Sequence, residues 1–150
     1  MVNSLTDYKR KKFAAMPFTR ELMITAVGYH PHARGHYCKR PRGSRGFVFL
    51  YCIEGSGWVK YDGQDTIVTR NQGVFLRPEQ AHEYGASKTH PWSYYYIHYE
   101  GALAVDYTRL LLDEQESGTY WIKETDEYLK RFSMILSLIH ISEPTRQSKI

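Results

Sequence analysis

The chain has 150 residues, a formal net charge of +4 and an aromatic content of 15%, and thirteen of its residues are tyrosine. This length suits one domain with a real hydrophobic core. No apolar run approaches the roughly 20 residues that span a bilayer, and the N-terminus lacks a signal-peptide core. The two cysteines, Cys38 and Cys52, are too few for a disulfide framework. We therefore expect a cytoplasmic protein with free thiols and no membrane association.

Residues 1–20 form a polar and basic segment with little hydrophobic periodicity. Its charge is concentrated at Lys9–Lys12. A basic cluster is able to contact nucleic acid, but no recognition helix accompanies this one. The composition therefore predicts a solvated, flexible N-terminal arm, and nothing in this chain indicates that it reads DNA bases itself.

Short strands are predicted from residue 21 onward. Glu21–Val27 is a plausible first strand that Gly28 ends, and His30–Arg34 is a predicted loop. His36–Lys39 is a second short strand, which leads into the turn Arg40–Gly43.

The central part of the sequence carries the clearest strand signals. Phe47–Ile53 is apolar or aromatic at nearly every position, as expected of a strand that is buried on both faces. After the turn Glu54–Gly57, Trp58–Tyr61 and Thr66–Thr69 flank an Asp62-Gly63 pair. An Asp-Gly pair between alternating strands predicts a tight β-hairpin.

The strand pattern continues to residue 101. Val74–Arg77 is a brief strand that Pro78 ends, and His82–Tyr84 and Trp92–Glu100 complete the series. Regularly spaced short strands with tight turns predict a double-sheet jelly roll or small barrel over residues 21–101.

An ordered series of short motifs resembles a known family. The motifs are Arg40-Pro41-Arg42-Gly43, Ile53-Glu54-Gly55-Ser56-Gly57, Gly73, Phe75-Leu76-Arg77-Pro78, His82-Glu83-Tyr84-Gly85, Pro91-Trp92 and His98-Tyr99-Glu100-Gly101. The series resembles the sensor domain of AraC-type transcription regulators over roughly Glu21 to Leu112. The resemblance implies a cupin fold that binds a small molecule, typically a sugar. It also implies an N-terminal arm able to fold over the occupied pocket, and a homodimer that contacts DNA only through a C-terminal domain absent from this chain.

The resemblance also points to ligand-binding residues. Arg40 and Tyr84 match the family's pocket arginine and tyrosine, and His30 is a candidate for the wall near the arm. Tyr94 and Tyr96 stand where the family carries a histidine and a tryptophan. They share one face of a strand because side chains alternate, while Arg40 offers a rigid fork for sugar hydroxyls or a carboxylate.

A metal site or an active site is the alternative interpretation. His30 and His32, with His36 further on, have a spacing that metal-binding cupins use. However, no acidic residue lies between His32 and Arg45, and Pro31 disfavours a regular strand there. No nucleophile elbow or phosphate loop is present. We therefore predict no catalytic residue, metal or cofactor. The rival hypothesis is a small cupin enzyme, such as a metal-dependent isomerase or dioxygenase, and bound stoichiometric metal would favour it.

The pattern changes after Gly101. Ala102–Leu112 lacks glycine and proline and predicts a helix, and Tyr120–Ile122 is a short apolar connector. A second helix is expected to begin near Thr125, with Thr125 as a plain N-cap. The fold prediction is therefore a barrel followed by one complete and one partial helix, with residues 102–135 as the start of a helical dimerisation region.

The C-terminal segment, residues 136–150, needs a different explanation. Leu136–Arg146 reads LSLIHISEPTR, which is one reading frame of a sequencing adapter over eleven consecutive residues. Gln147–Ile150 fits the index that would follow. We therefore interpret this tail as foreign sequence fused to a truncated gene, and such a segment is excluded from fold reasoning.

Overall fold

The computed structural model describes residues 2–4, 6–17, 20–111 and 119–121. Two helices are present in this part of the chain, α1 (Asp7–Ala14) and α2 (Ala104–Leu111). Its strands are β1 (Val2–Ser4), β2 (Met23–His30), β3 (Tyr37–Arg40), β4 (Phe47–Glu54), β5 (Ser56–Tyr61), β6 (Gln64–Thr69), β7 (Gln72–Leu76), β8 (His82–Ala86), β9 (Ser93–Glu100) and β10 (Thr119–Trp121). No described helix is long and apolar enough to cross a membrane.

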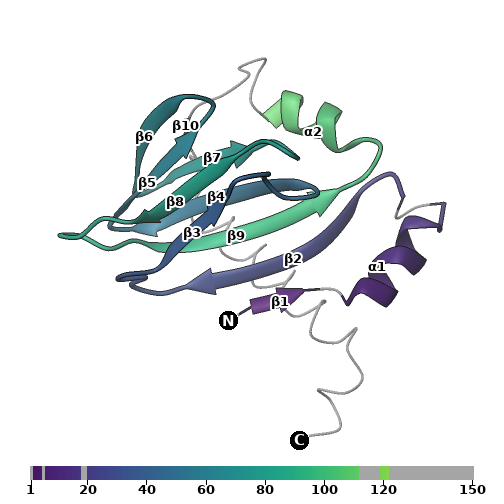
Figure 1. Ribbon diagram of the computed structural model, residues 1–150, viewed down its shortest axis with the longest axis horizontal. Coiled ribbons are helices and arrows are strands. Elements are labelled where there is room, and N and C mark those ends of the chain that lie inside the picture. Colours follow the sequence, from purple (N-terminus) through teal and green to yellow (C-terminus); the bar gives the residue numbers. More distant parts are fainter. Residues whose placement is uncertain (1, 5, 18–19, 112–118, 122–150) are drawn as a thin grey trace, which may run out of the picture.

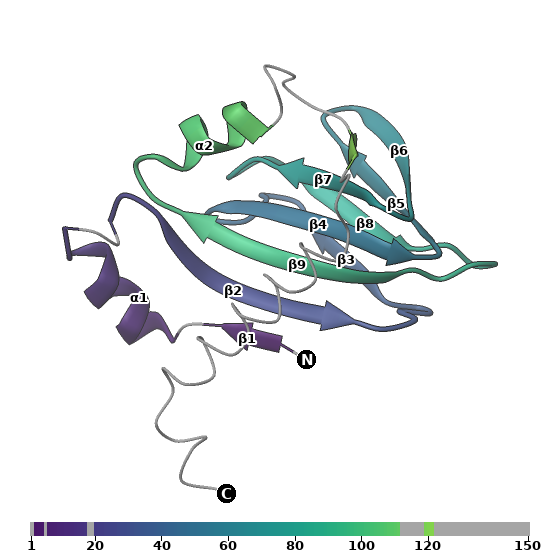
Figure 2. The same ribbon diagram turned by 180° about the vertical axis from the view of Figure 1, so that it is seen from behind.

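The strands form two antiparallel sheets that face each other (Figure 1). The larger sheet has the strand order β1-β2-β9-β4-β7-β10, and the smaller sheet has the order β3-β8-β5-β6. Figure 2 shows the same arrangement from behind, with both helices near the end of the molecule where β9 finishes. The predicted mainly-β, double-sheet architecture is confirmed, and α2 confirms the helix expected after the barrel.

Strand β4 lies at the centre of the larger sheet, between β7 and β9. Val48 and Leu50 point into the core between the two sheets, whereas Phe47 and Phe49 belong to a second apolar cluster on the opposite face. All four side chains are buried. This explains the continuous apolar run in the sequence, because an alternating pattern suits only a strand with one wet face.

The hairpin β5–β6 has the register expected from the sequence. Trp58 pairs with Ile67 and Tyr61 pairs with Gln64, which leaves a two-residue turn. Asp62 and Gly63 have φ values of 53° and 71°. Both are left-handed, as a type I′ turn requires, so the Asp62-Gly63 prediction is confirmed together with its physical reason.

Trp92 is fully buried between the sheets and fixes their spacing near the start of β9. Its ring lies against the bare backbone of Gly57 on β5. A Cβ atom added to Gly57 would lie 2.3 Å from Cδ2 of Trp92. Glycine at this position is therefore a packing requirement.

Helix α2 packs through a small polar contact. The Tyr99 hydroxyl lies 2.6 Å from Oγ1 of Thr108, and that Oγ1 donates to the carbonyl oxygen of Ala104 at 2.7 Å. Ala104 and Thr108 are both buried.

The second helix expected from Thr125 and the tail 136–150 lie outside the described residues.

The N-terminal segment contains regular structure that the sequence did not predict. Strand β1 pairs with the edge of β2, and Thr6 caps α1 by accepting a hydrogen bond from the backbone N–H of Lys9 at 3.3 Å. Arg10 lies 3.7 Å from Glu100 on β9. Because α1 is held by such polar contacts, it lacks the apolar periodicity that reveals a helix in a sequence.

Several boundaries also differ from the predicted ones. His30, expected in a loop, is the last residue of β2, and Arg40, expected to begin a turn, is the last residue of β3. The apolar connector around Tyr120 is strand β10, which pairs with β7. In each case pairing with a distant strand extends the regular structure beyond its local signal.

Candidate functional site

A cavity of about 320 Å³ lies between the sheets, among β2, β3, β8 and β9. The structure brings all five predicted ligand-binding residues together here. Its lining consists of Ala26, His30, His36, Tyr37, Cys38, Arg40, Tyr84, Tyr94, Tyr96 and His98.

Strand register explains why these side chains converge. On the larger sheet, His30 pairs with Tyr94 and Ala26 pairs with His98. Tyr96 lies between Tyr94 and His98 on β9, so all three share one face. The smaller sheet supplies the opposite wall through the antiparallel pair β3–β8.

Arg40 is the cationic centre of the site. Its Nη1 lies 3.1 Å from Nε2 of His82 on the neighbouring strand. A guanidinium only donates, so Nε2 accepts and His82 is neutral with its proton on Nδ1. That Nδ1 is buried and has no hydrogen-bond partner among the described residues. Burial, together with the charge of Arg40, lowers the pKa of His82 to about 4.

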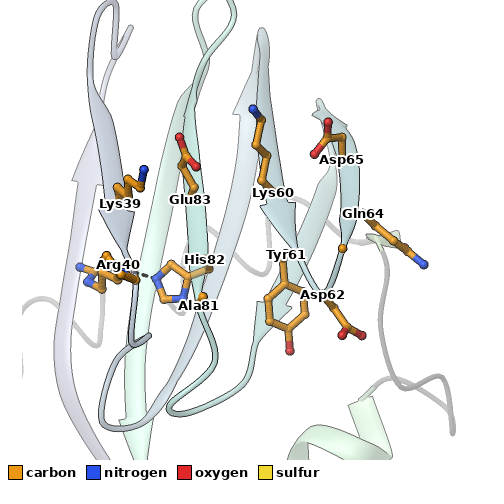
Figure 3. A pocket seen from close by; sticks show the side chains of 12 residues that line it. Lys39, Arg40, Lys60, Tyr61, Asp62, Gln64, Asp65, Ala81, His82 and Glu83 are labelled. Atoms are coloured by element: carbon orange, nitrogen blue, oxygen red, sulfur yellow. Dashed lines mark hydrogen bonds between the residues drawn. The ribbon is translucent and has the colours of Figure 1, made fainter.

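Arg40 also lines a second hollow of about 320 Å³ at the end of the smaller sheet (Figure 3). Lys39, Lys60 and Glu83 line this hollow from the other face of the strands. In the close-up, Arg40 and His82 lie side by side on neighbouring strands. Arg40 lines both the interior cavity and the outer hollow, whereas His82 lines only the hollow.

Four aromatic rings lie close together in the lining of the cavity. The ring of His30 lies 4.4 Å from that of His36, 5.2 Å from that of Tyr94 and 5.6 Å from that of Tyr96. The hydroxyl of Tyr94 lies 3.1 Å from Nδ1 of His36. Burial lowers the pKa of His30, and the neighbouring His36 adds to this effect.

The three tyrosines remain protonated over the physiological range. Burial raises the pKa of Tyr84, Tyr94 and Tyr96. Each side chain therefore keeps a hydroxyl that is able to donate or accept. Tyr96, which is 9% exposed, makes no hydrogen bond within the described residues, so its hydroxyl is available to a bound molecule.

Five further lining residues were not predicted as ligand-binding residues: Ala26, His36, Tyr37, Cys38 and His98. His98 lies on the same face of β9 as Tyr94 and Tyr96, and burial followed by the charge of Arg40 lowers its pKa to about 4. Cys38 lies beside Tyr84 on the paired strand β3. The spacing of two residues between Tyr96 and His98 was a usable signal, whereas the position of Cys38 required the β3–β8 register.

The histidines considered as metal ligands do not all face the same cavity. His30 faces the cavity, whereas His32 lies in the following turn and lines a separate cavity of about 500 Å³ with Arg34 and His90. The backbone N–H of His32 donates to Oγ of Ser93 at 2.9 Å. Within the described part of the chain, no three His, Cys, Asp or Glu side chains are grouped to hold a metal ion.

Residues 24–149 match the family model of the AraC-like ligand binding domain. The chain belongs to this family. The resemblance predicted from the motifs is therefore confirmed. The matched range includes residues 136–149, and the adapter-derived origin of these residues stays a prediction.

Similar proteins include a transcriptional regulator and cupin structures. The chain is 30% identical over 95 residues to the MmsAB operon regulatory protein of Pseudomonas aeruginosa, covering 61% of this chain and 31% of that protein. It therefore spans about a third of that relative's length. A cupin 2 conserved barrel domain protein from Salinispora arenicola is 14% identical, with 73% of this chain and 82% of that chain covered at a TM-score of 0.45. The Cupin_2 domain of an XRE family transcriptional regulator from Enterobacter cloacae is 20% identical, with 67% and 96% covered at a TM-score of 0.42.

Proposed function

We propose that the interior cavity binds a small polar molecule and that this binding is the sensing step of an AraC-type transcription regulator. One observation carries the proposal: a guanidinium, tyrosine hydroxyls and imidazole rings from both sheets converge on one cavity of about 320 Å³. Cavities of this size, lined by aromatic side chains with a few directed polar groups, are typical small-molecule sites.

The resemblance favours a carbohydrate as the ligand class. Rings such as those of Tyr94 and Tyr96 offer flat apolar faces for a sugar ring, and their hydroxyls offer partners for sugar hydroxyls. In the intact regulator, this module would also dimerise and would reach DNA through a further domain. Membership of a ligand-binding family favours this function over the cupin enzyme considered from the sequence.

Alanine substitution at Arg40 tests the site. A thermal-shift screen of sugars and related polar metabolites would first identify a stabilising compound. Calorimetry with that compound should then show that Arg40→Ala lowers affinity at least about tenfold, because charge-assisted hydrogen bonds are lost. Arg34→Ala is the matched control, since Arg34 is exposed and lines a different cavity.

A filled cavity gives an independent check. Ala26 lines the interior cavity, so Ala26→Leu should reduce binding by occupying ligand space while it leaves Arg40 in place. A compound that binds the wild type, Arg40→Ala and Ala26→Leu with the same affinity would contradict the proposed site.

A further inference from the structure

The interior cavity contains a permanent positive charge and no acidic side chain. Its lining includes neither aspartate nor glutamate, and Arg40 is its only lysine or arginine. Arg40 is half-buried and forms no ion pair with any residue in the described part of the chain. Among the described residues, no carboxylate therefore lies within ion-pair distance of its guanidinium.

The outer face of the smaller sheet carries charged side chains of both signs. Glu83 lies between Lys39 and Lys60 in the strand register, and Lys60 also pairs with Asp65 (Figure 3). Opposite charges thus alternate across the smaller sheet on its outer face. Carboxylates therefore line the outer hollow that Arg40 also borders, whereas the interior cavity has none in its lining.

The charge of Arg40 reaches histidines on both sheets. It lowers the pKa values of both His82 and His98, after the larger effect of burial, and these two side chains come from different sheets. Arg40 is thus the one permanent cation among the residues that line the cavity, and it presents a planar fork of N–H donors.

We infer that the molecule bound in this cavity carries a single carboxylate, which pairs with Arg40, and at least one further polar group within reach of the Tyr96 hydroxyl. This inference rests on the proposed function. A neutral sugar would leave a half-buried cation without a counter-charge, whereas a carboxylate matches the guanidinium fork in both geometry and charge. A phosphate ester, with nearly two negative charges near neutral pH, exceeds the single cation available.

Two sources of a carboxylate are compatible with this chemistry: sugar acids and short hydroxy acids. The test compares each acid with its own neutral amide, which has nearly the same shape. We would use D-glucuronate with D-glucuronamide, lactate with lactamide, and acetate with acetamide as the smallest probe. Calorimetry gives the affinities, and side-chain NMR of Arg40 and His98 reports binding inside the cavity.

At least one acid should bind at least about tenfold more tightly than its amide and should shift the Arg40 resonance in a saturable way. Arg40→Gln should remove the preference for the acid. Lys39→Gln is the matched control, because it removes the same charge from the neighbouring residue on the exposed face, and it should retain the preference. The pair that responds most strongly would distinguish a sugar acid from a short hydroxy acid.

Three outcomes would overturn the inference. One is equal binding of acid and amide in the cavity, which would leave the proposed sensing function standing and exclude only the anionic class. Another is an acid preference that survives Arg40→Gln but is lost in Lys39→Gln. The third is the absence of any carboxylate-dependent shift at Arg40, even with acetate in large excess. The proposed function has its own, separate test in the Ala26→Leu and Arg40→Ala variants.

Discussion

At the scale of single residues, the Arg40–His82 contact determines the chemistry of the site. Arg40 is always protonated, so its partner His82 must supply a lone pair and remain neutral. Only the fold provides this partner, because the two residues lie 42 positions apart in the sequence and meet through the pairing of β3 with β8. The contact makes the folded state sensitive to acid.

We expect the free energy of unfolding to fall by about 2 kcal/mol between about pH 7 and about pH 5 through His82. The pKa of His82 is about 4 in the folded protein, below the ordinary value of 6.5, so the unfolded chain takes up the proton first. The stabilising contribution is therefore complete above pH 6.5 and is lost as the pH falls toward 4. His98 has the same direction of shift and adds to the loss.

Urea unfolding of wild type and His82→Gln at both pH values measures this effect. The variant should lose a substantial part of the pH dependence, whereas His90→Gln, which removes an exposed histidine, should retain it. Identical pH profiles for wild type and His82→Gln would refute the assignment.

A second residue-scale prediction concerns the Gly57–Trp92 contact. Gly57→Ala should destabilise the fold by roughly 1–3 kcal/mol, because overpacking a rigid core forces the ring or the backbone to move. The added Cβ would lie 2.3 Å from a fully buried indole. Chemical denaturation measures the loss. Gly63→Asn is the control variant, because a Cβ at Gly63 meets no atom within 4 Å and asparagine tolerates its φ of 71°. Equal stability of Gly57→Ala and wild type would contradict the packing argument.

At the scale of elements, β9 serves two surfaces at once. Tyr94 and Tyr96 face the cavity, whereas Tyr95 and Tyr99 lie on the opposite side of the sheet. Tyr99 carries the contact to α2, which follows β9 directly. The same strand thus joins the interior cavity to the first helix of the region predicted to dimerise.

The Tyr99–Thr108 contact should couple β9 to α2 measurably. Thr108→Val keeps the shape of the side chain and removes the hydroxyl, so it should cost about 1–3 kcal/mol by leaving the buried Tyr99 hydroxyl without its partner. Tyr99→Phe in the same chain should restore part of that loss, because both polar groups are then absent. A double-mutant cycle by chemical denaturation gives the coupling energy, and additive losses would show that the two hydroxyls do not interact.

At the scale of the whole molecule, the cavity lies where the edges of the two sheets approach each other. β2 and β3 are consecutive strands in the chain but belong to different sheets. β1 covers the free edge of β2, and its last residue, Ser4, pairs with the cavity residue Ala26 (Figure 1). The N-terminal segment thus joins the barrel next to the candidate site.

Removing residues 1–5 should loosen β2 without unfolding the barrel. The backbone groups of β2 that face β1 would lose their partners, so amide exchange over residues 26–28 should rise at least about tenfold. Residues 48–51 of β4 should be unaffected, because β4 pairs with β7 and β9. Hydrogen-exchange mass spectrometry makes the comparison, and unchanged exchange over residues 26–28 would show that β1 contributes no protection.

The sequence by itself determined most of the strands between residues 21 and 101, their turns and the side chains that share a strand face. Asp62-Gly63 specified its hairpin because a type I′ turn needs positive φ at two adjacent residues, which is a local demand. The run from Phe47 to Ile53 indicated a strand buried on both faces, since only such burial favours consecutive apolar residues. The position of Tyr94 and Tyr96 on one face of their strand followed from the alternation of side chains in any strand.

The tertiary structure alone decided which of those faces meet. Three features depend on the register between strands that are distant in sequence. They are the contact of Arg40 with His82, the position of His98 in the cavity lining and the pairing of β1 with β2. A local pattern fixes the side of a strand to which a residue points, but not the strand that lies opposite. That choice follows from packing around buried groups such as Trp92, which hold the two sheets at one spacing and so bring the polar side chains to a common cavity.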